Sequence, residues 1–402
     1  MSAPLSLTLD VTAVPPRPAG AGRYTVELAS ALAQRSDVEL TLLARRADTG
    51  RWSDAALLAA APDRVLGVAP SPRPLRLAWE QLALGRLLDR EAPDVHHGPH
   101  YTMPERTRRP VVVTIHDCTF FDHPEWHERS KAVLFRRAIR VAAVRASVLV
   151  CVSRTTAERL VEVCEVRAPV VVAPHGVDHD RFSPEEPSPG SDALALGAIG
   201  VDTARPYIAF VGTLEPRKGV ADLVAAFDRL ASRHPELALV VAGQPGWGDT
   251  GIEEALAASS ARGRIVLPGY VPDGTVAPLL RKASAVAYPS IEEGYGLPAL
   301  EALACGAPLV TTRGTAMEEV AGDAAWLVAP RSPEELAGAL DAVLSGAEDT
   351  AAHRALGLAE AARRTWSASA ERHLAAYRLA SGERALAPTD DGAPHGGAGA
   401  VR

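Results

Sequence analysis

The chain has 402 residues, of which 47% are hydrophobic and 23% are charged. This balance is typical of globular proteins and excludes a disordered or fibrous chain. At roughly 150 residues per domain, the length predicts two or three domains. The net charge is -7, and arginine replaces lysine almost throughout. Arginine-rich stretches are therefore weak indicators of nucleic-acid binding, and we predict no nucleic-acid partner.

No apolar run approaches the roughly 20 residues that a membrane-spanning helix needs. The first residues lead into a strand-like run without a basic segment or a cleavage site, so we expect no secretory signal and place the protein in the cytoplasm. The four cysteines contain no C-x-x-C pair and are expected to be reduced core thiols.

The first half of the chain alternates strand-like apolar runs with helix-like stretches, which is the rhythm of βαβ units. Continuous apolar runs indicate strands that are buried on both faces of a parallel sheet. The expected strands are Leu5–Leu9, Val38–Leu43, Val111–Ile115, Val148–Val152 and Val170–Val172, and the expected helices are Tyr24–Gln34 and Leu75–Arg90. Residues 1–183 are therefore predicted to form an N-terminal Rossmann-like domain.

A proline- and serine-rich stretch begins after this domain, and we interpret residues 184–206 as a linker. The same alternation of strand-like and helix-like segments resumes in residues 207–365 and predicts a second α/β domain. Its expected strands are Tyr207–Val211, Leu237–Ala242, Ile265–Leu267, Ala285–Tyr288 and Leu309–Thr311, and its expected helices are Val220–Arg233, Pro333–Leu344 and Ala351–Arg364. Residues 366–386 predict a C-terminal helix, and residues 387–402 a disordered tail.

Ligands of doubly wound parallel sheets bind at the carboxyl ends of the strands. Two such domains that face each other across a cleft bring two sets of strand ends together. We therefore predict an α/β protein with two Rossmann-like domains and a functional site between them.

The most informative stretch is E-G-Y-G-L-P-A-L-E at residues 293–301, which follows a predicted strand. Its two glycines let backbone N–H groups approach a ligand, and its proline suits the first turn of a helix whose free N–H groups point at the same place. Glu293 and Glu301 flank this phosphate cradle. Ionised carboxylates accept hydrogen bonds from hydroxyl groups, so the pair suits a sugar and a ribose. The alternative is a capped helix with two solvated glutamates.

A second motif, G-T-L-E-P-R-K at residues 212–218, leaves another predicted strand through a tight loop. Arg217 and Lys218 lie in this loop, where two adjacent cations can neutralise a diphosphate and stabilise it as a leaving group. The alternative is an ordinary basic pair on the surface.

Both motifs resemble those of the family-4 retaining glycosyltransferases of the GT-B fold, and the resemblance extends over most of residues 5–380. It implies a metal-independent retaining hexosyltransferase that needs no cofactor and moves a sugar from a nucleotide diphosphate sugar to a hydroxyl of a glycan or lipid-linked acceptor. It also implies that Arg217 and Lys218 contact the donor diphosphate, Glu293 the donor sugar and Glu301 the ribose. The surrounding loops would complete the donor site through Gly212, Thr213, Gly294, Tyr295, Gly296 and Leu297.

Two segments of the first, acceptor-side domain are predicted to face this site. Gly20 and Gly22 follow the first strand and open a helix, so the resemblance implies that their loop meets the donor from the opposite wall. Thr25 stands where a nicotinamide fingerprint has its third glycine, which argues against that cofactor. His116 and Asp117 lie at the carboxyl end of a strand, where catalytic side chains gather. The resemblance implies that His116 touches a donor-sugar hydroxyl; the alternative is a histidine satisfied in the core.

The T-I-H-D segment at residues 114–117, with P-E-W at 124–126, is most similar to bacterial mannosyltransferases that build surface polysaccharides. GDP-mannose is therefore the expected donor.

We expect no bound metal, because the run from His96 to His100 and the pair Asp178 and Asp180 match no zinc or nucleotide-metal spacing. The rival functions are a sugar-nucleotide 2-epimerase-like isomerase on the same fold and a non-catalytic nucleotide-sugar-binding protein.

Residues 129–145 predict an amphipathic basic helix with Arg129, Arg136, Arg137 and Arg140 on one side. Such a face can rest on anionic lipid head groups, so peripheral contact with the inner face of the cell membrane is a hypothesis. The alternative is a solvated helix face in an arginine-rich protein.

Overall fold

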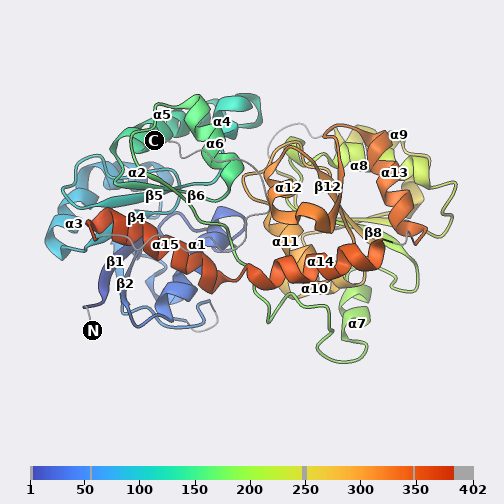
Figure 1. Ribbon diagram of the computed structural model, residues 1–402, viewed down its shortest axis with the longest axis horizontal. Coiled ribbons are helices and arrows are strands. Elements are labelled where there is room, and N and C mark those ends of the chain that lie inside the picture. The colour runs from blue at the N-terminus through green and yellow to red at the C-terminus, as the bar shows by residue number, and fades with distance from the viewer. Residues whose placement is uncertain (1–2, 55–56, 247–250, 347–348, 384–402) are drawn as a thin grey trace.

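The computed structural model describes residues 3–54, 57–246, 251–346 and 349–383, and it shows two α/β domains side by side (Figure 1). Each domain is built on one parallel sheet, so the predicted fold class of two Rossmann-like domains is confirmed. The predicted tail at residues 387–402 lies outside the described residues.

The strands of the first sheet follow the order β3-β2-β1-β4-β5-β6-β7. They are β1 (Leu5–Asp10), β2 (Val38–Arg45), β3 (Arg64–Ala69), β4 (Val95–Gly98), β5 (Val111–Ile115), β6 (Val148–Cys151) and β7 (Val170–Val172). The sequence predicted neither β3 nor β4. The first is a half-exposed edge strand, and the second reads Val-His-His-Gly, which lacks a continuous apolar run.

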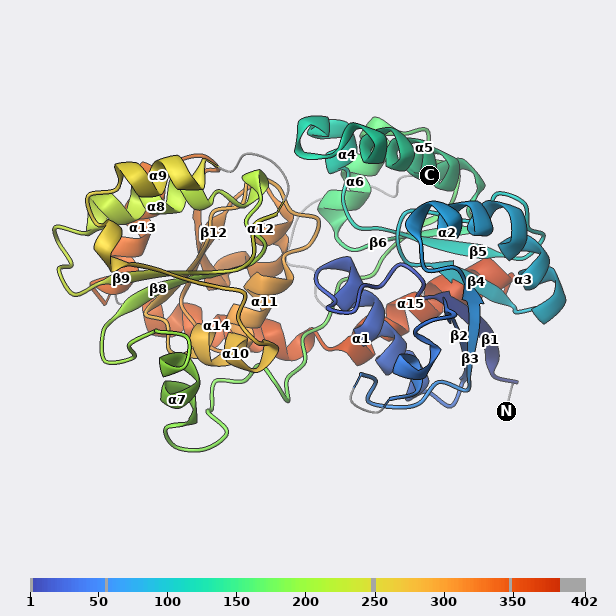
Figure 2. The same cartoon turned by 180° about the vertical axis from the view of Figure 1, so that it is seen from behind.

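Helices cover both faces of this sheet (Figures 1 and 2). They are α1 (Ala21–Ala33), α2 (Arg73–Trp79), the π-helical turn Glu80–Leu84, α3 (Gly85–Glu91), α4 (Thr119–Asp122), α5 (Arg129–Arg145), α6 (Arg154–Val163) and α15 (Trp366–Ser381), with 3-10 turns at Thr49–Ser53 and Pro124–Trp126. On one face, α1 and α15 bury Trp366 and Tyr377 against Leu9. On the other, Phe135 and Leu160 pack beneath α5 and α6.

The histidines of β4 are core residues. The His96 ring lies 3.0 Å from the Thr8 hydroxyl, and the His97 ring 2.7 Å from that of Thr114. The Tyr377 hydroxyl of α15 lies 2.9 Å from the other ring nitrogen of His97. Burial lowers the pKa of His96 to about 3 and that of His97 below its ordinary value, so both rings are neutral. In the described part of the chain, no group of three or more His, Cys, Asp or Glu side chains is placed to hold a metal ion.

The strands of the second sheet follow the order β10-β9-β8-β11-β12-β13. They are β8 (Tyr207–Val211), β9 (Ala238–Ala242), β10 (Ile265–Gly269), β11 (Ala285–Tyr288), β12 (Leu309–Thr312) and β13 (Ala325–Val328). The helices are α7 (Ser191–Gly197), α8 (Val220–Leu230), α9 (Ile252–Ala258), α10 (Asp273–Arg281), α11 (Leu297–Ala304), α12 (Ala316–Ala321), α13 (Pro333–Leu344) and α14 (Thr350–Arg363), with 3-10 turns at Pro216–Lys218, Arg262–Arg264 and Gly322–Ala324. The sequence did not predict β13, an edge strand whose two central residues are only partly buried.

The segment 184–206, predicted as a linker, contains the helix α7. Asp192 of α7 is fully buried and accepts two 2.7 Å hydrogen bonds from Arg281 of α10. Leu196 enters the core of the second domain. This stretch therefore packs on the second domain, although its proline-rich first half shows no helical pattern.

The chain crosses between the domains after β7 and again between α14 and α15. These two connections lie side by side, because Val177 N–H donates to the Arg364 carbonyl at 2.9 Å. A Cβ added to Gly176 would overlap the backbone of Thr365 and Trp366, so glycine permits this close approach. The last helix, α15, thereby returns to the first domain (Figure 1).

Helix α5 spans Arg129–Arg145, as the sequence predicted, but one of its arginines lies elsewhere than expected. Arg136 turns inward, where its Nε donates to the Phe120 carbonyl at 2.5 Å. Arg137 and Arg140 are exposed, and Val133 is 70% exposed on the same helix. No helix in the described residues is long and apolar enough to cross a membrane.

Candidate active site between the two domains

The site begins where β8 and β11 end. These strands are neighbours in a parallel sheet, so the loops that follow them leave the same edge side by side. The N–H of Ile291 donates to the Arg217 carbonyl at 2.7 Å and ties the two loops together. Gly219 has φ of 65°, and a Cβ there would overlap the carbonyl of Pro289. Glycine therefore allows the turn that carries Arg217 and Lys218 to lie against the loop that carries Glu293.

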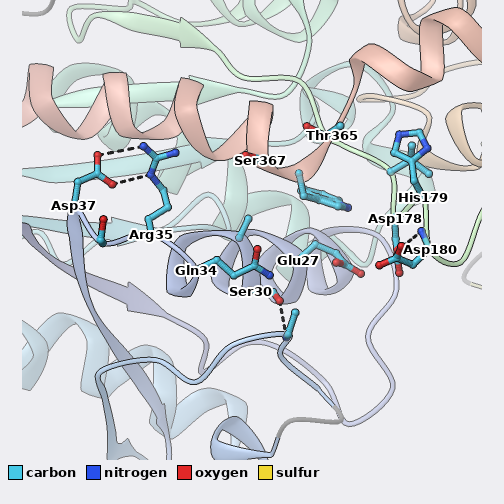
Figure 3. A pocket seen from close by; sticks show the side chains of 15 residues that line it. Glu27, Ser30, Gln34, Arg35, Asp37, Asp178, His179, Asp180, Thr365 and Ser367 are labelled. Atoms are coloured by element: carbon cyan, nitrogen blue, oxygen red, sulfur yellow. Dashed lines mark hydrogen bonds and ion pairs between the residues drawn. The ribbon is translucent and has the colours of Figure 1, made fainter.

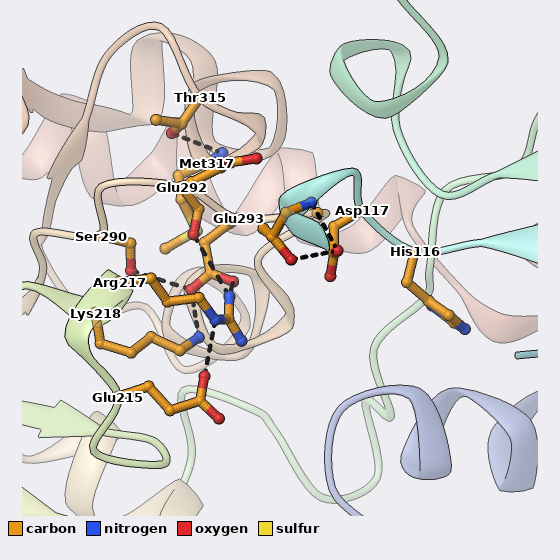
Figure 4. Close-up of polar contacts among 12 residues, drawn as sticks. His116, Asp117, Glu215, Arg217, Lys218, Ser290, Glu292, Glu293, Thr315 and Met317 are labelled. Carbon is orange, nitrogen blue, oxygen red and sulfur yellow. Dashed lines mark hydrogen bonds and ion pairs between the residues drawn. The ribbon is translucent and has the colours of Figure 1, made fainter. Parts of the chain in front are cut away.

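Glu293 is the centre of a buried polar cluster (Figure 4). Its carboxylate accepts hydrogen bonds from Arg217 Nη1 at 2.6 Å, from Lys218 Nζ and from the Ser290 hydroxyl at 3.0 Å. Arg217 also donates through Nε to Glu215 at 2.8 Å. The Glu293 side chain is only 8% exposed. The structure thus brings together three residues that the sequence placed at one site, Arg217, Lys218 and Glu293.

The charges of this cluster depend on one another. Burial alone would raise the pKa of the Glu293 carboxyl, but Arg217 and Lys218 lower it to about 2. Burial and the adjacent Arg217 lower the pKa of Lys218. A guanidinium has five N–H groups and an ammonium three, and Glu293 and Glu215 engage only part of them. The cluster therefore retains N–H groups that can donate hydrogen bonds to an anion.

The loop after Glu293 is packed between the domains. A Cβ on Gly294 would overlap the carbonyl oxygen of His116 in the first domain. The Gly294 carbonyl accepts hydrogen bonds from Ser153 Oγ at 2.7 Å and Thr156 Oγ1 at 3.1 Å. The Tyr295 hydroxyl donates to the His175 carbonyl at 2.8 Å. This loop is therefore held by first-domain groups on one side and by Glu293 on the other.

The helix α11 starts immediately after this loop. Gly296 precedes it with φ of 108°, and a Cβ there would meet the Met317 sulfur. Leu297 packs against the cores of both domains. Gly212 and Thr213 lie on the neighbouring loop, where a Cβ on Gly243 would overlap the Gly212 carbonyl. The predicted loop residues therefore lie on neighbouring loops at one edge of the second sheet.

The ring of His116 does not join the cluster. Its Nε2–H donates to the Pro99 carbonyl at 2.8 Å, and the ring packs edge-on against Tyr24 with centroids 5.0 Å apart. Figure 4 shows it pointing away from Glu293 and Asp117. This geometry matches the alternative of a histidine satisfied in the core. What His116 contributes at the interface here is its backbone carbonyl, which faces Gly294.

Glu301 lies apart from the cluster and faces the first domain. Arg23, which follows Gly20 and Gly22, donates from Nη1 to Glu301 Oε1 at 3.1 Å. Its Nη2 donates to Asp273 at 3.0 Å. The predicted glycine loop therefore opposes Glu301 across the domain interface through Arg23. Sequence reasoning missed Arg23, whose only signal was its position directly after the two glycines.

Comparison with known proteins divides the chain in the same way as the structure. The profile described as Glycosyltransferase Family 4 matches residues 18–181, and the one described as Glycosyl transferases group 1 matches residues 197–361. The chain belongs to glycosyltransferase family 4. It is therefore an enzyme that transfers a sugar unit from a nucleotide sugar.

One curated relative aligns over most of this chain, and solved structures share its fold. O-antigen chain mannosyltransferase B of Escherichia coli is 28% identical over 382 residues, which cover 90% of this chain and 96% of the relative. A sucrose-phosphate synthase from Thermosynechococcus elongatus has the same fold, with a TM-score of 0.73, 18% identity and coverage of 93% and 98%. HepE of Anabaena, solved with UDP-glucose, gives a TM-score of 0.70 at 18% identity, with coverage of 92% and 99%.

A hollow of about 420 Å³ opens beside the Glu293 cluster of the glycosyltransferase. Both domains line it, with Asp117 and Arg159 from the first and Glu292, Glu293 and Thr315 from the second. Burial, with Asp122 and Asp117 nearby, raises the pKa of Glu292 to about 7. Sequence reasoning overlooked Glu292, although two consecutive acidic residues after a buried strand were a usable signal.

A larger hollow, of about 700 Å³, lies between α1 and the two segments that cross between the domains (Figure 3). Its lining includes Glu27 and Gln34 of α1, Asp178 of the first crossover and Trp366 of α15. None of the predicted site residues of the glycosyltransferase lines this hollow. Size alone therefore does not identify the site, which is located by the cluster around Glu293.

Proposed function

We propose that this glycosyltransferase moves a mannosyl unit from GDP-mannose to a hydroxyl of a glycan or lipid-linked acceptor, with retention of the anomeric configuration. The observation that carries the proposal is the cluster in which Arg217 and Lys218 both bond Glu293 at the carboxyl ends of β8 and β11. Mannose is favoured because the E. coli relative named as an O-antigen mannosyltransferase aligns over 96% of its length.

In the proposed reaction, the bond between the anomeric carbon and the diphosphate breaks, and its electron pair leaves with the diphosphate. Arg217 and Lys218 donate hydrogen bonds to the departing oxygens, where charge increases. The positive sugar remains beside Glu293, whose carboxylate accepts from sugar hydroxyls. The acceptor hydroxyl adds on the face that the diphosphate left, and its proton goes to the leaving phosphate. Preorganised donors of this kind are worth on the order of 10²–10³ in rate.

The remaining residues are proposed to hold the donor in place. Glu301 would accept a hydrogen bond from the nucleotide ribose, and the backbone of Gly294 to Leu297 would approach the phosphates at the start of α11. Gly20 and Gly22 would approach from the first domain. In this scheme the two cations neutralise the diphosphate in place of a metal, and no cofactor takes part.

A thermal-shift panel of GDP-, UDP- and ADP-sugars tests the donor. A ligand at 100 times its dissociation constant stabilises the folded protein by about 2.7 kcal/mol, so GDP-mannose is expected to give the largest shift. Nuclear magnetic resonance of the transferred product then reads the anomeric configuration. A largest shift with another sugar nucleotide overturns the donor assignment, and an inverted product overturns retention.

The same panel separates the rival functions. Incubation of the donor with the protein alone would give slow release of free nucleotide from a transferase. An epimerised sugar nucleotide would indicate an isomerase instead. Binding without any turnover, with or without acceptor mixtures, would indicate a sugar-nucleotide sensor.

We also propose that the first domain contacts anionic lipid through α5. The exposed side of this helix carries Arg129 and Arg140 together with Val133, and Arg137 and Arg145 are also exposed but pair with Glu105. Basic side chains near an anionic surface contribute about 1 kcal/mol each, and an exposed valine adds apolar area. This contact would place the enzyme at the inner face of the membrane, close to a lipid-linked acceptor.

A further inference from the structure

Arg23 bonds two carboxylates of the opposite domain at once. Its Nη1 donates to Glu301 Oε1 at 3.1 Å and its Nη2 to Asp273 Oδ2 at 3.0 Å. The Arg23 side chain is 18% exposed and that of Glu301 11%, so this pair is largely removed from water. Asp273, in contrast, is 63% exposed at the start of α10. The guanidinium therefore has one buried partner and one surface partner.

The second anchor of Arg23 is itself held in place. Arg181, on the crossover after β7, donates from Nη2 to the Asp273 carbonyl at 2.5 Å. Its Nη1 lies 3.7 Å from the Asp273 carboxylate. Asp273 is thus fixed from two directions, and it can keep the Arg23 guanidinium oriented while Arg23 holds Glu301.

The two oxygens of Glu301 differ in their surroundings. Oε1 is occupied by Arg23, whereas within the described residues Oε2 has no hydrogen-bond partner. Burial raises the pKa of Glu301, and Arg23 is the strongest charge that opposes this. Because the Arg23 guanidinium bonds one oxygen of this carboxyl group, the other oxygen is held in a fixed direction as an acceptor.

We propose that Arg23 is a positioning residue for donor recognition, which holds Glu301 so that Oε2 accepts a hydroxyl of the nucleotide ribose. This inference rests on the proposed contact between Glu301 and the ribose. Because Arg23 belongs to the first domain and Glu301 to the second, the ribose site is complete only while the two domains are in contact. Recognition of the nucleotide is thereby linked to closure of the cleft.

The test is a ratio of two dissociation constants measured by calorimetry on the full chain. The probes are whichever of GDP, UDP and ADP stabilises the protein most and its 2′,3′-dideoxy form, which lacks the ribose hydroxyls. A hydrogen bond to a charged group is worth about 1.5–3 kcal/mol, so the parent is expected to bind the dideoxy form at least about tenfold more weakly. Arg23→Met and Glu301→Gln are each expected to reduce this ratio to below about threefold.

Two further variants separate positioning from simple stabilisation. Arg23→Lys keeps the positive charge, so its ratio of dissociation constants is expected to be close to that of the parent. Asp273→Asn weakens the second anchor of Arg23 while the bond between Arg23 and Glu301 can still form, so its ratio is expected to lie between those of the parent and Arg23→Met. Where Arg23→Met fails to fold, as shown by its melting temperature, Arg23→Gln serves in its place with the same expectation.

Each outcome decides between the two ideas. If Glu301→Gln keeps the parent ratio, or if no diphosphate binds, the proposed ribose contact is wrong and the inference falls with it. If the ratio of dissociation constants falls in Glu301→Gln but stays at the parent value in Arg23→Met, the ribose contact is supported and the role of Arg23 is overturned. Equal weakening of both probes by Arg23→Met, with an unchanged ratio, would show a merely structural salt bridge.

Discussion

Gly294 and His116 meet backbone to backbone across the domain interface, so that a Cβ on Gly294 would overlap the His116 carbonyl oxygen. The overlapping atom belongs to the backbone and cannot rotate away. The position directly after Glu293 is therefore closed to any side chain while the domains are in contact. Gly294 therefore belongs both to the domain interface and to the candidate active site.

Gly294→Ala is expected to lower kcat/KM about 100-fold, because the added methyl group displaces the loop or separates the domains. Displacements of about 1 Å at a reacting centre have effects of this size. Gly338→Ala is the matched control, since Gly338 lies in α13 and a Cβ added there would meet no atom within 4 Å. Steady-state kinetics of both variants decide the matter, and parent-like activity of Gly294→Ala would contradict the geometry.

Glu293→Gln is expected to lower the free energy of unfolding by about 3 kcal/mol. The substitution leaves Arg217 and Lys218 buried without their shared carboxylate, and breaking a buried ion pair from one side is costly. A saturating nucleoside diphosphate should restore part of this loss, because it supplies negative charge to both cations. Denaturant unfolding with and without GDP measures the effect.

Glu215→Gln is the control for this prediction. Glu215 also bonds Arg217, but its side chain is 30% exposed, so its loss is expected to cost less than about 1 kcal/mol. Equal losses for the two variants would mean that the cluster is not held by its buried carboxylate.

The sequence predicted the central cluster because the sheet itself brings its parts together. Strands β8 and β11 are read from their apolar runs, and neighbouring parallel strands deliver their following loops to one edge. Arg217, Lys218 and Glu293 therefore followed from motif and topology. The fold class followed from the same runs. Strand β4, which lacks a continuous apolar run, was missed, and so were the partly exposed strands β3 and β13.

Other features could not be predicted, because they depend on packing between distant segments. Strand β4 buries His96 and His97, whose partners Thr8 and Thr114 lie on other strands. Arg23 reaches Asp273 over 250 positions of sequence, through contact between the domains. The His116 ring could point to either side of its strand end, and only the packing of Tyr24 and Pro99 decides which.

Glu292 is expected to make stability fall as pH rises. Its pKa is raised from 4.5 to about 7, so between these values the folded state binds more protons than the unfolded state. The free energy of unfolding therefore decreases with pH across this window. Glu292→Gln should flatten that decrease in urea unfolding measured from pH 4.5 to 7. An identical slope in parent and variant would contradict the assignment.

Replacing Arg129, Arg137, Arg140 and Arg145 together by glutamine is expected to weaken flotation with anionic vesicles by about 100-fold or more, since each charge contributes about 1 kcal/mol. A control variant replaces four exposed arginines of the second domain, Arg205, Arg229, Arg233 and Arg313. The control should float like the parent. If both variants float equally well with the vesicles, α5 is not the helix that contacts the lipid.

The rate at which folded Lys218→Gln consumes GDP-mannose measures whether the cation pair stabilises the leaving diphosphate. Lys218 is buried against Glu293, whereas Lys282 is an exposed lysine paired with Glu186, and Lys282→Gln is the control. Lys218→Gln is expected to be 10²–10³-fold slower than the parent, whereas Lys282→Gln is expected to be unchanged. A folded Lys218→Gln that turns over the donor at the parent rate would contradict this stabilisation.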